Sequence, residues 1–250
     1  DALRVLRFRG NEGLSLPYRF ELDLVSLDGE VDFDAVVGEK ASFIWKAPDG
    51  ERFIHGIVSQ FEQAGHGRTL THYTLQLVPK VWSLTLRRRS RIFQNLATPD
   101  LLKKVLQDGA LVADEFRLSL TRSYSPRKYC VQYRETDFDF LSRLMEEEGI
   151  FYFFEHTEDG HVLVIGDDPT AHVPIEGTPE VPMRQGESEM LGEERITAFH
   201  YVRAMRMGAV MLRDFDFKRP ALDLKAEKLA EVETQFEYYD YPGEYPDTAL

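Results

Sequence analysis

The stretch that most restricts how this chain can fold is TDFDFLSRLMEEEGIFYFF, from Thr136 to Phe154. Thr136 and Asp139 have the spacing of a capping box, and Gly149 stands where a helix ends in a left-handed residue. Between them, apolar residues recur on one helical face: Phe138, Leu141, Leu144 and Met145. Four aromatic residues follow the helix stop at once, so an amphipathic helix must lie beside an aromatic strand. The stretch predicts a compact α+β unit in which the aromatic side chains cover the helix.

The residues on either side extend this unit. The apolar runs IFYFFE and HVLVIG flank a turn at residues 157–160 and therefore predict a hairpin. Upstream, Thr98 and Pro99 have the order of a helix start, with Thr98 as the cap, and Gly109 follows as the stop. We assign residues 92–168 to one α+β insertion.

The first part of the chain has the pattern of antiparallel strands. In LSLPYRFELDLV, residues 14–25, apolar and polar side chains alternate with period two, which is typical of a half-buried strand. Residues 40–79 predict a meander of three strands, with turns at 48–50 and 65–67. We assign residues 1–91 to a first β-barrel subdomain.

The last third of the chain has weaker patterns. Residues 169–195 are rich in Pro, Gly and Glu with little periodicity, and we expect a linker or surface loop. From Ile196 on, ITAFHYV, AVMLRDFDFKRP and ALDL are extended patterns, while AEKLAEVE fits a short helix or a further strand. The final EYYDYPGEYPDTAL predicts an irregular aromatic segment without a last strand. We assign residues 196–250 to part of a second β-barrel subdomain, so the predicted fold class is mainly β with an α+β insertion.

Charge and cysteine content exclude several classes of protein. The 30 basic and 43 acidic residues give a formal charge of -13, which repels nucleic acid and anionic membrane surfaces over most of the molecule. The single cysteine, Cys130, allows no intramolecular disulfide and no multi-cysteine zinc site. Its alternating surroundings, KYCVQY, predict a small buried side chain.

No stretch approaches the roughly 20 apolar residues of a membrane helix, and the first residues lack the pattern of a signal peptide. We therefore expect synthesis in the cytoplasm, no nucleic acid partner and no stable membrane association.

Two closely spaced carboxylate pairs are the residues that best fit catalysis. Asp137 with Asp139, and Asp214 with Asp216, have spacings that suggest a glycosidase-like acid and base. The first pair falls in a predicted first helical turn, where carboxylates complement the helix dipole, and the second falls on one face of a predicted strand. General acid–base chemistry needs two opposed environments, which spacing alone does not provide. We therefore expect no enzyme activity.

Six of the seven histidines fall in two groups along the sequence, and neither group has the order of a metal site. His156 and His161 flank the predicted hairpin turn, from where they can approach one another, and we interpret them as exposed turn residues. The full groups are His156, His161 and His172, and His55, His66 and His72. Because nucleotide-binding and nucleophile motifs are absent as well, we expect no metal and no cofactor.

Two segments are candidates for protein contacts. RRRSR is a concentrated basic patch in an acidic chain and suits a partner with a negative surface. RRRSR fits a solvated strand end equally well. Nucleic acid is the second candidate ligand for this basic patch. EYYDYPGEY is an aromatic loop bounded by Pro and Gly, which is typical of an interface or a packed edge, with carbohydrate binding by the Tyr238–Tyr245 aromatics as an alternative. The predicted interface residues are Arg87, Arg88, Arg89, Arg91, Tyr239, Tyr241 and Tyr245.

Six segments, in order, resemble blocks of one protein family. YCVQYRETDFDFLSRLMEEEGIFYFFEH is similar to the hallmark segment of VgrG proteins, the spike proteins of type VI secretion systems, in the region that resembles contractile-phage baseplate hubs. The other segments are FRGNEGLSLPYRFELDLVS, IHGIVSQF, RIFQNLATPDLLKKVL, VMLRDFDFKRP and YYDYPGEY. Together they cover essentially the whole chain.

The resemblance implies both a fold and a function. It implies two β-barrel subdomains, similar to the Hcp tube protein, that flank the α+β insertion. Three copies then close a homotrimeric ring whose six barrels match the Hcp tube hexamer, which requires a head-to-tail interface on each copy. The implied role is the non-catalytic hub base of a puncturing spike, which carries a needle and secreted effectors or adaptors. Such a protein leaves the cell through the type VI apparatus, toward the extracellular space or a target cell.

Two other functions fit the same residues. A phage tail or tailocin baseplate hub shares the implied fold, and the sequence barely separates it from a secretion spike. A cell-wall hydrolase that works through one of the carboxylate pairs is the alternative from a different class.

Overall fold

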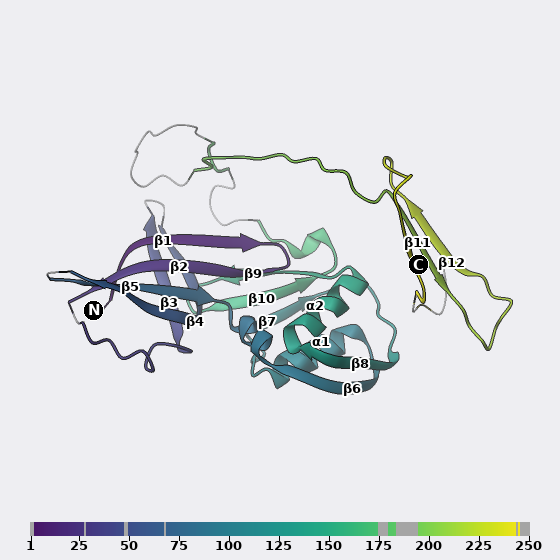
Figure 1. Ribbon diagram of the computed structural model, residues 1–250, viewed down its shortest axis with the longest axis horizontal. Helices are drawn as coiled ribbons and strands as arrows, with labels where there is room; N and C mark the ends of the chain where they lie inside the picture. Colours follow the sequence, from purple (N-terminus) through teal and green to yellow (C-terminus); the bar gives the residue numbers. More distant parts are fainter. Residues whose placement is uncertain are drawn as a thin grey trace. The chain divides into compact units, whose positions relative to one another are not determined.

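The computed structural model describes residues 3–27, 29–47, 50–67, 69–174, 180–183, 195–243 and 245. The chain divides into two compact units: unit 1 comprises residues 1–182 with 188–195, and unit 2 comprises residues 183–187 with 196–250 (Figure 1). Far more residues lie in strands than in helices, which confirms the predicted mainly β fold.

Unit 1 begins with a five-stranded antiparallel sheet that curls into half a barrel (Figure 1). The strand order is β1-β2-β5-β4-β3. The bounds are β1 (Arg4–Gly13), β2 (Leu16–Ser26), β3 (Lys40–Ala47), β4 (Gly50–His66) and β5 (Thr71–Val78). β2 has the predicted alternation, because Tyr18, Phe20, Leu22 and Leu24 are all buried.

The predicted three-stranded meander is formed by β3, β4 and β5, which pair as antiparallel neighbours. β4 continues to His66, so the turn expected at 65–67 lies at the very end of the strand. The turn expected at 48–50 includes Pro48 and Asp49, which are outside the described residues.

The α+β part of unit 1 follows a 3₁₀ helix, η1 (Lys80–Leu86). β6 pairs with β8 in a two-stranded ribbon, while β10 pairs with both β7 and β9 in a three-stranded sheet. β6 begins inside the range 1–91 that we assigned to the first subdomain, yet its partner strand lies in the insertion. The bounds are β6 (Arg88–Leu96), α1 (Thr98–Asp108), β7 (Phe116–Ser119), β8 (Arg127–Thr136), α2 (Asp137–Glu148), β9 (Phe151–His156), β10 (His161–Gly166) and the 3₁₀ turn η2 (Pro169–Ala171).

Helix α2 begins and ends as its sequence predicts. The Thr136 hydroxyl accepts a hydrogen bond from the backbone N–H of Asp139 at 3.0 Å. Gly149 ends the helix in the left-handed conformation, with φ 63°. The buried face differs from the prediction at one position, because Phe140 is fully buried and Phe138 is only partly buried.

Helix α1 is capped differently from the prediction. Its N-cap is Ala97, with no side-chain hydrogen bond, and Thr98 is already the first helical residue. The Thr98 side chain is buried and its hydroxyl donates to Glu148 Oε1 at 3.0 Å, which ties the start of α1 to the end of α2. Pro99 does lie in the first turn, and the helix ends before Gly109 as expected.

Two hydrophobic cores lie in unit 1, and the aromatic strand β9 joins them. One core packs both helices against the sheets of the insertion, and Tyr152 belongs to it. The other fills the half-barrel around Tyr18, Phe61 and Leu77. Phe154 packs against both cores, with its ring centroid 4.9 Å from that of Tyr18. The aromatic run therefore covers the helix, as predicted, and also docks the insertion on the half-barrel.

Unit 2 is a single three-stranded layer. Its strands are β11 (Ala209–Asp214), β12 (Leu224–Leu229) and β13 (Glu237–Asp240), in the order β12-β11-β13. AEKLAEVE therefore begins as a strand, and the prediction that the C-terminal segment contains no strand was wrong, because β13 pairs in parallel with β11. The stretch ITAFHYV is extended, but in the described residues its only strand contact is a bridge from Ile196 to Met183.

Much of the predicted linker, residues 169–195, is outside the described part of the chain. Its described residues include the turn η2, in which the Asp168 carboxylate accepts from the backbone N–H of Thr170 at 2.9 Å. Within the described ranges, no helix is both long and apolar enough to cross a membrane.

Candidate interaction surfaces

Three of the four arginines predicted as an interface converge on one buried carboxylate. Arg91 Nη2 lies 2.7 Å from Asp137 Oδ1, and Arg87 Nε lies 3.3 Å from Asp137 Oδ2. Arg89 Nε is 3.8 Å from the same oxygen, and Gln132 Nε2 donates to Oδ1 at 2.9 Å. The Asp137 side chain is fully buried. This network fixes the start of α2 against both strands of the β6–β8 ribbon.

The network changes what the basic patch can do. Arg91 is mostly enclosed, whereas the side chain of Arg89 is 44% exposed and Arg88 lies at the surface. Arg88 is exposed, and its Nε donates to the carbonyl of Arg134 at 2.7 Å. A contact of this patch with an acidic partner stays a prediction, and it is best carried by Arg88 and Arg89.

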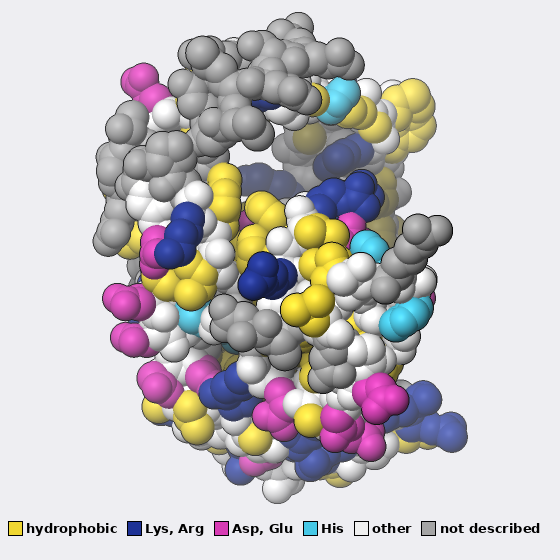
Figure 2. Space-filling view, turned by 90° about the vertical axis from the view of Figure 1, so that its left-hand side faces the viewer, with side chains coloured by type: hydrophobic (Ala, Val, Ile, Leu, Met, Phe, Trp, Pro, Cys, Tyr) yellow, Lys and Arg dark blue, Asp and Glu magenta, His cyan; other side chains and the backbone are white. Residues whose placement is uncertain are grey.

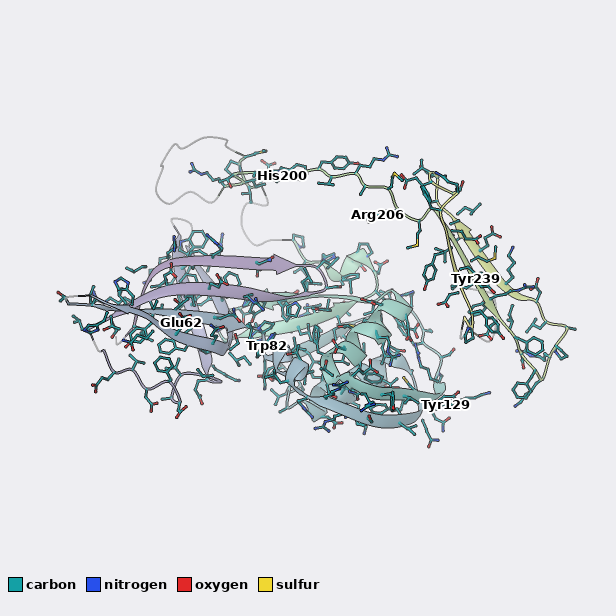
Figure 3. All side chains as sticks on the ribbon, viewed as in Figure 1. Glu62, Trp82, Tyr129, His200, Arg206 and Tyr239 are labelled. Atoms are coloured by element: carbon teal, nitrogen blue, oxygen red, sulfur yellow. The ribbon has the colours of Figure 1, made fainter. Side chains whose placement is uncertain are left out.

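The outer face of the β6–β8 ribbon is apolar. Ile92 pairs with Val131, and Tyr129 and Tyr133 lie two residues before and after Val131, on the same face. Ile92, Tyr129 and Tyr133 are 69%, 70% and 68% exposed. We call these four residues the ribbon face; Figure 3 marks Tyr129 on it. Cys130, between them, points inward and is buried, which raises the pKa of its thiol and confirms the predicted small buried side chain.

The ribbon face has a signal in the sequence that we did not use. In KYCVQY the large apolar residues alternate with Cys130 and Gln132, and both of these are buried. A strand that buries the smaller residues must show its tyrosines on the other side.

The aromatic segment of unit 2 forms part of a strand surface. Tyr239 pairs with Met211, and Met211 pairs with Glu227 on its other side. Glu237 and Leu229 both pair with Ala209, so these side chains share one face of the sheet. Figure 3 marks Tyr239, which is 54% exposed. We call this set the tyrosine face: Met211, Glu227, Leu229, Glu237 and Tyr239.

The other two predicted tyrosines differ from one another. Tyr241 is exposed, as an interface residue would be. The Tyr245 hydroxyl donates to the carbonyls of Leu212 and Leu224, at 3.0 and 2.7 Å. Tyr245 therefore fastens the last described residue to its own sheet, and its predicted interface role stays untested.

Three histidines from the two sequence groups meet between β4 and the β9–β10 hairpin. The backbone N–H of His55 donates to His156 Nδ1 at 3.2 Å, and the rings of His156 and His161 are 5.9 Å apart. Burial, helped by the neighbouring His161 and His55, lowers the pKa of His156 to about 4. Burial also lowers the pKa of His161 to about 4. The interpretation of His156 and His161 as exposed turn residues was wrong, because β4 covers them.

The remaining histidines of the two groups lie at the surface, on β4, on β5 and after η2, and His200 of unit 2 is exposed as well. Among the described residues, no group of His, Cys, Asp and Glu side chains is arranged to hold a metal ion. The lowered pKa values keep the His156 and His161 rings neutral at pH 7. Their meeting with His55 depends on a contact between residues about 100 positions apart that no local pattern reveals.

The two members of each carboxylate pair lie in different surroundings, and each is accounted for by its structural contacts. Asp137 is buried among arginines, while Asp139 is exposed. Asp214 ends β11, and Asp216 lies in the turn after it, so the prediction that both share a strand face was wrong. Asp216 accepts from Lys218 N and Arg219 Nε, both at 2.8 Å, and these hydrogen bonds, first that from Arg219, lower its pKa.

Charge is mixed on the end of the molecule drawn in Figure 2. Basic side chains are scattered there among acidic and hydrophobic ones, and they do not gather into one continuous basic surface on the face shown. A protein partner suits such a mixed surface better than a nucleic acid does.

Comparisons with known proteins place the chain among tail and spike components. Its sequence matches the phage tail baseplate hub (GPD) family over residues 11–249. It is 38% identical over 249 residues to the type VI secretion system spike protein VgrG1b of Pseudomonas aeruginosa, covering 98% of this chain and 33% of that protein. It is 39% identical to the spike protein VgrG4b of the same organism, covering 98% of this chain and 30% of the relative. The chain thus spans about a third of the length of these relatives.

Solved structures agree on the fold. An Escherichia coli component of the type VI secretion system, described as similar to bacteriophage tail proteins, matches with a TM-score of 0.64 at 29% identity, covering 67% of this chain and 47% of the other. A tail protein from Neisseria meningitidis matches with a TM-score of 0.58 at 14% identity, covering 95% and 69%. The resemblance that six sequence segments suggested is confirmed.

Proposed function

We propose that this chain, which belongs to the phage tail baseplate hub family, is the hub part of a type VI secretion spike with a structural role. The observation that carries this proposal is the match to the hub family, which runs from residue 11 to residue 249 and so includes both units. The identity of 38% to a VgrG spike protein favours the secretion spike within that family.

The spike is proposed to assemble as a homotrimer seated on an Hcp hexamer. The half-barrel supports this, because β1 and β3 are sheet edges that a neighbouring chain can cover. A spike hub must transmit thrust without deforming, and the two cores joined through Phe154 give unit 1 the close packing that rigidity needs. The needle, and secreted effectors or adaptors, are proposed to lie beyond the ring, and the assembled spike to leave the cytoplasm through the apparatus.

We infer that the hub carries out no catalysis. Asp137 is neutralised by arginines in the core of the insertion, which suits structural support. The Asp216 carboxylate accepts hydrogen bonds from Lys218 N and Arg219 Nε within its own turn. The proposed function therefore depends on shape: the ring must close, and its base must fit the tube.

A phage tail or tailocin hub is the second candidate. The Neisseria tail protein covers 95% of this chain, but its 14% identity supports only a shared fold. Sequence identity is much higher toward the spike proteins, so we favour the spike.

The proposal is tested by the mass of the purified protein in solution, alone and with Hcp hexamers. We expect particles of three times the 28.9 kDa chain mass, and a complex in which one such trimer binds one hexamer. A protein that stays monomeric at high concentration and ignores Hcp, or a dimer of twofold symmetry, would contradict it.

A further inference from the structure

The two cores of unit 1 are built from separate lengths of chain. Among the described residues, the buried members of the half-barrel core all lie within 18–77, and those of the insertion core all lie within 81–165. The chain passes from one part to the other through Pro79, between β5 and η1. Phe154 packs against both cores but is only partly buried. Because a body with its own core can stay folded when its neighbour moves away, the contact between these parts is a candidate hinge.

Two histidines of the β9–β10 hairpin lie in this contact. The ring of Tyr18, on β2, is 5.0 Å from that of His156 and 5.8 Å from that of His161, measured between centroids. The Tyr18 hydroxyl donates to the carbonyl of His55 on β4. The half-barrel therefore surrounds the two rings with side chains and backbone from two of its strands.

Each of the two histidines accepts a hydrogen bond from a backbone N–H. His55 N donates to His156 Nδ1 at 3.2 Å, and Lys80 N, directly after Pro79, donates to His161 Nε2 at 3.3 Å. A backbone N–H can only donate, so both acceptor nitrogens carry no proton in this arrangement. A proton added to either ring goes to that nitrogen, which breaks the hydrogen bond and sets one N–H against another. The other nitrogen of His156, Nε2, is buried with no hydrogen-bond partner among the described residues.

The charged groups around His161 do not favour its protonation. Glu115 is the carboxylate that faces it, and both Lys40 and Lys80 form ion pairs with Glu115. Burial is the first cause that lowers the pKa of His161; Glu115 opposes it, and His55 and the two lysines add to it. With two lysines beside it, Glu115 leaves little negative charge for a protonated His161.

The titratable groups that face His156 offer no negative charge. They are His55, His161 and Tyr18. Burial lowers the pKa of His156, and the two histidines add to this effect. Tyr18 is uncharged, because burial raises the pKa of its hydroxyl.

His55 differs from the other two rings. Its Nε2 lies 2.8 Å from the carbonyl of Thr157, and its Nδ1 lies 2.8 Å from Ser42 Oγ. A hydroxyl both donates and accepts, so His55 keeps both hydrogen bonds in either protonation state. The response to acid therefore belongs to His156 and His161.

We propose that this contact is a pH-sensitive hinge: in mild acid the α+β insertion separates from the half-barrel about Pro79, while both cores stay folded. His156 Nδ1 and His161 Nε2 each take up a proton from solvent, and their two backbone hydrogen bonds break. The hydrogen bond from Ser15 N to the carbonyl of Tyr152, at 2.8 Å, contains no titrating group and favours closure equally at both pH values. The inference concerns unit 1 alone and does not depend on the proposed function.

Amide hydrogen exchange of the whole chain at pH 7 and pH 5 measures the opening. The amides of His55 and Lys80 report on the hinge, and that of Leu144 reports on the insertion core. The open state binds more protons, because each ring has a pKa of about 4 when enclosed and an ordinary value of 6.5. For each ring freed, the opening constant should therefore rise by about 20-fold from pH 7 to pH 5. After correction for the intrinsic effect of pH, protection at His55 and Lys80 should fall by that factor.

The same experiment in low urea shows whether the opening is local. Separation of two folded parts exposes little surface, so exchange at His55 and Lys80 should depend weakly on urea and be less protected than Leu144. Equal protection at pH 7 and pH 5 would overturn the proposal. Protection and urea dependence equal to those of Leu144 would also overturn it, because the two parts would then separate only by global unfolding.

Glutamine variants distinguish the hinge from a general effect of acid. His156→Gln and His161→Gln keep an acceptor for the backbone N–H but do not titrate, so each should lose about one 20-fold step of the pH dependence. His72→Gln, at an exposed position on β5, is the matched control and should keep the full dependence. If both hairpin variants respond to pH like the parent, other groups cause the opening and the proposal is wrong.

Discussion

Unit 1 packs strands against helices around two cores, whereas unit 2 holds three strands in one layer with two buried hydrophobic residues among those described. Both are rich in aromatic and apolar residues, so composition does not separate them. What separates them is whether the described residues supply a second layer for each sheet. Those of unit 1 do, and those of unit 2 leave its sheet as a single layer.

The largest expected effect is the loss of the carboxylate at the centre of the arginine network. Asp137→Ala should destabilise unit 1 by about 4 kcal/mol, because it leaves arginines partly buried without their counter-ion. Both tryptophans, Trp45 and Trp82, lie in unit 1, so fluorescence during denaturant unfolding reports this unit alone. Asp139→Ala, at an exposed position in the same helical turn, is the control and should cost far less. Equal stabilities of the two variants would show that the network contributes nothing.

A pair of leucine truncations compares the two units directly. Leu144→Ala removes a fully buried side chain from the core of the insertion and should cost about 3 kcal/mol in the tryptophan-detected transition. Leu224→Ala removes the main buried residue of unit 2 and should leave that transition within about 0.5 kcal/mol of the parent, because unit 1 does not depend on it. A matching loss from Leu224→Ala would mean that the two units unfold as one.

Acid should weaken the joint between the half-barrel and the insertion. The pKa values of His156 and His161 are about 4 when folded, below the ordinary 6.5, so the unfolded chain binds more protons between these limits. Stability is fully present above pH 6.5 and falls toward pH 4, by on the order of 2 kcal/mol for each ring at pH 5. Among the groups that face His161, Glu115 raises its pKa, while His55, Lys40 and Lys80 lower it together with burial.

The measurement is the denaturant midpoint of unit 1 at pH 7 and pH 5. His156→Leu should reduce the loss on acidification, while His72→Gln, at an exposed position on β5, should not change it. A parent protein with the same midpoint at both pH values would contradict the buried, neutral state of these rings.

The smallest expected effect concerns the cap of α2. Thr136→Ala should cost about 1 kcal/mol, because the N–H of Asp139 loses its acceptor. Thr136→Ser keeps the hydroxyl and should stay close to the parent. Thermal unfolding followed by tryptophan fluorescence is precise enough to separate the two, and equal destabilisation by both would point to the lost methyl group instead.

Local patterns in the sequence were sufficient for several elements of unit 1: β2, the β3–β5 meander, α2 and the β9–β10 hairpin. The alternation in β2, the Thr136 cap and the Gly149 stop all depend on neighbours within a few residues, and each was predictable. The prediction of Thr98 as the cap of α1 was wrong for a tertiary reason. Its hydroxyl donates to Glu148, some 50 residues away, and does not cap the start of the helix. β13 was missed because four exposed residues give a weak pattern, and because they pair in parallel with a distant strand.

The candidate surfaces were only partly predictable for a similar reason. The basic cluster Arg87–Arg91 was evident, but its internal partner Asp137 had already been explained as a helix-dipole carboxylate. The histidine cluster required contact between β4 and the β9–β10 hairpin. In both cases the residue types were visible in the sequence, while their meeting depended on tertiary packing.

The most direct test of the difference between the units is amide hydrogen exchange, measured on the chain as a dilute monomer. We predict strong protection for α2, which packs in the core of the insertion, and weak protection for β11 and β13, whose sheet is a single layer among the described residues. If β11 and β13 are already protected as strongly as α2 in the monomer, unit 2 is stable by itself and our account of it is wrong.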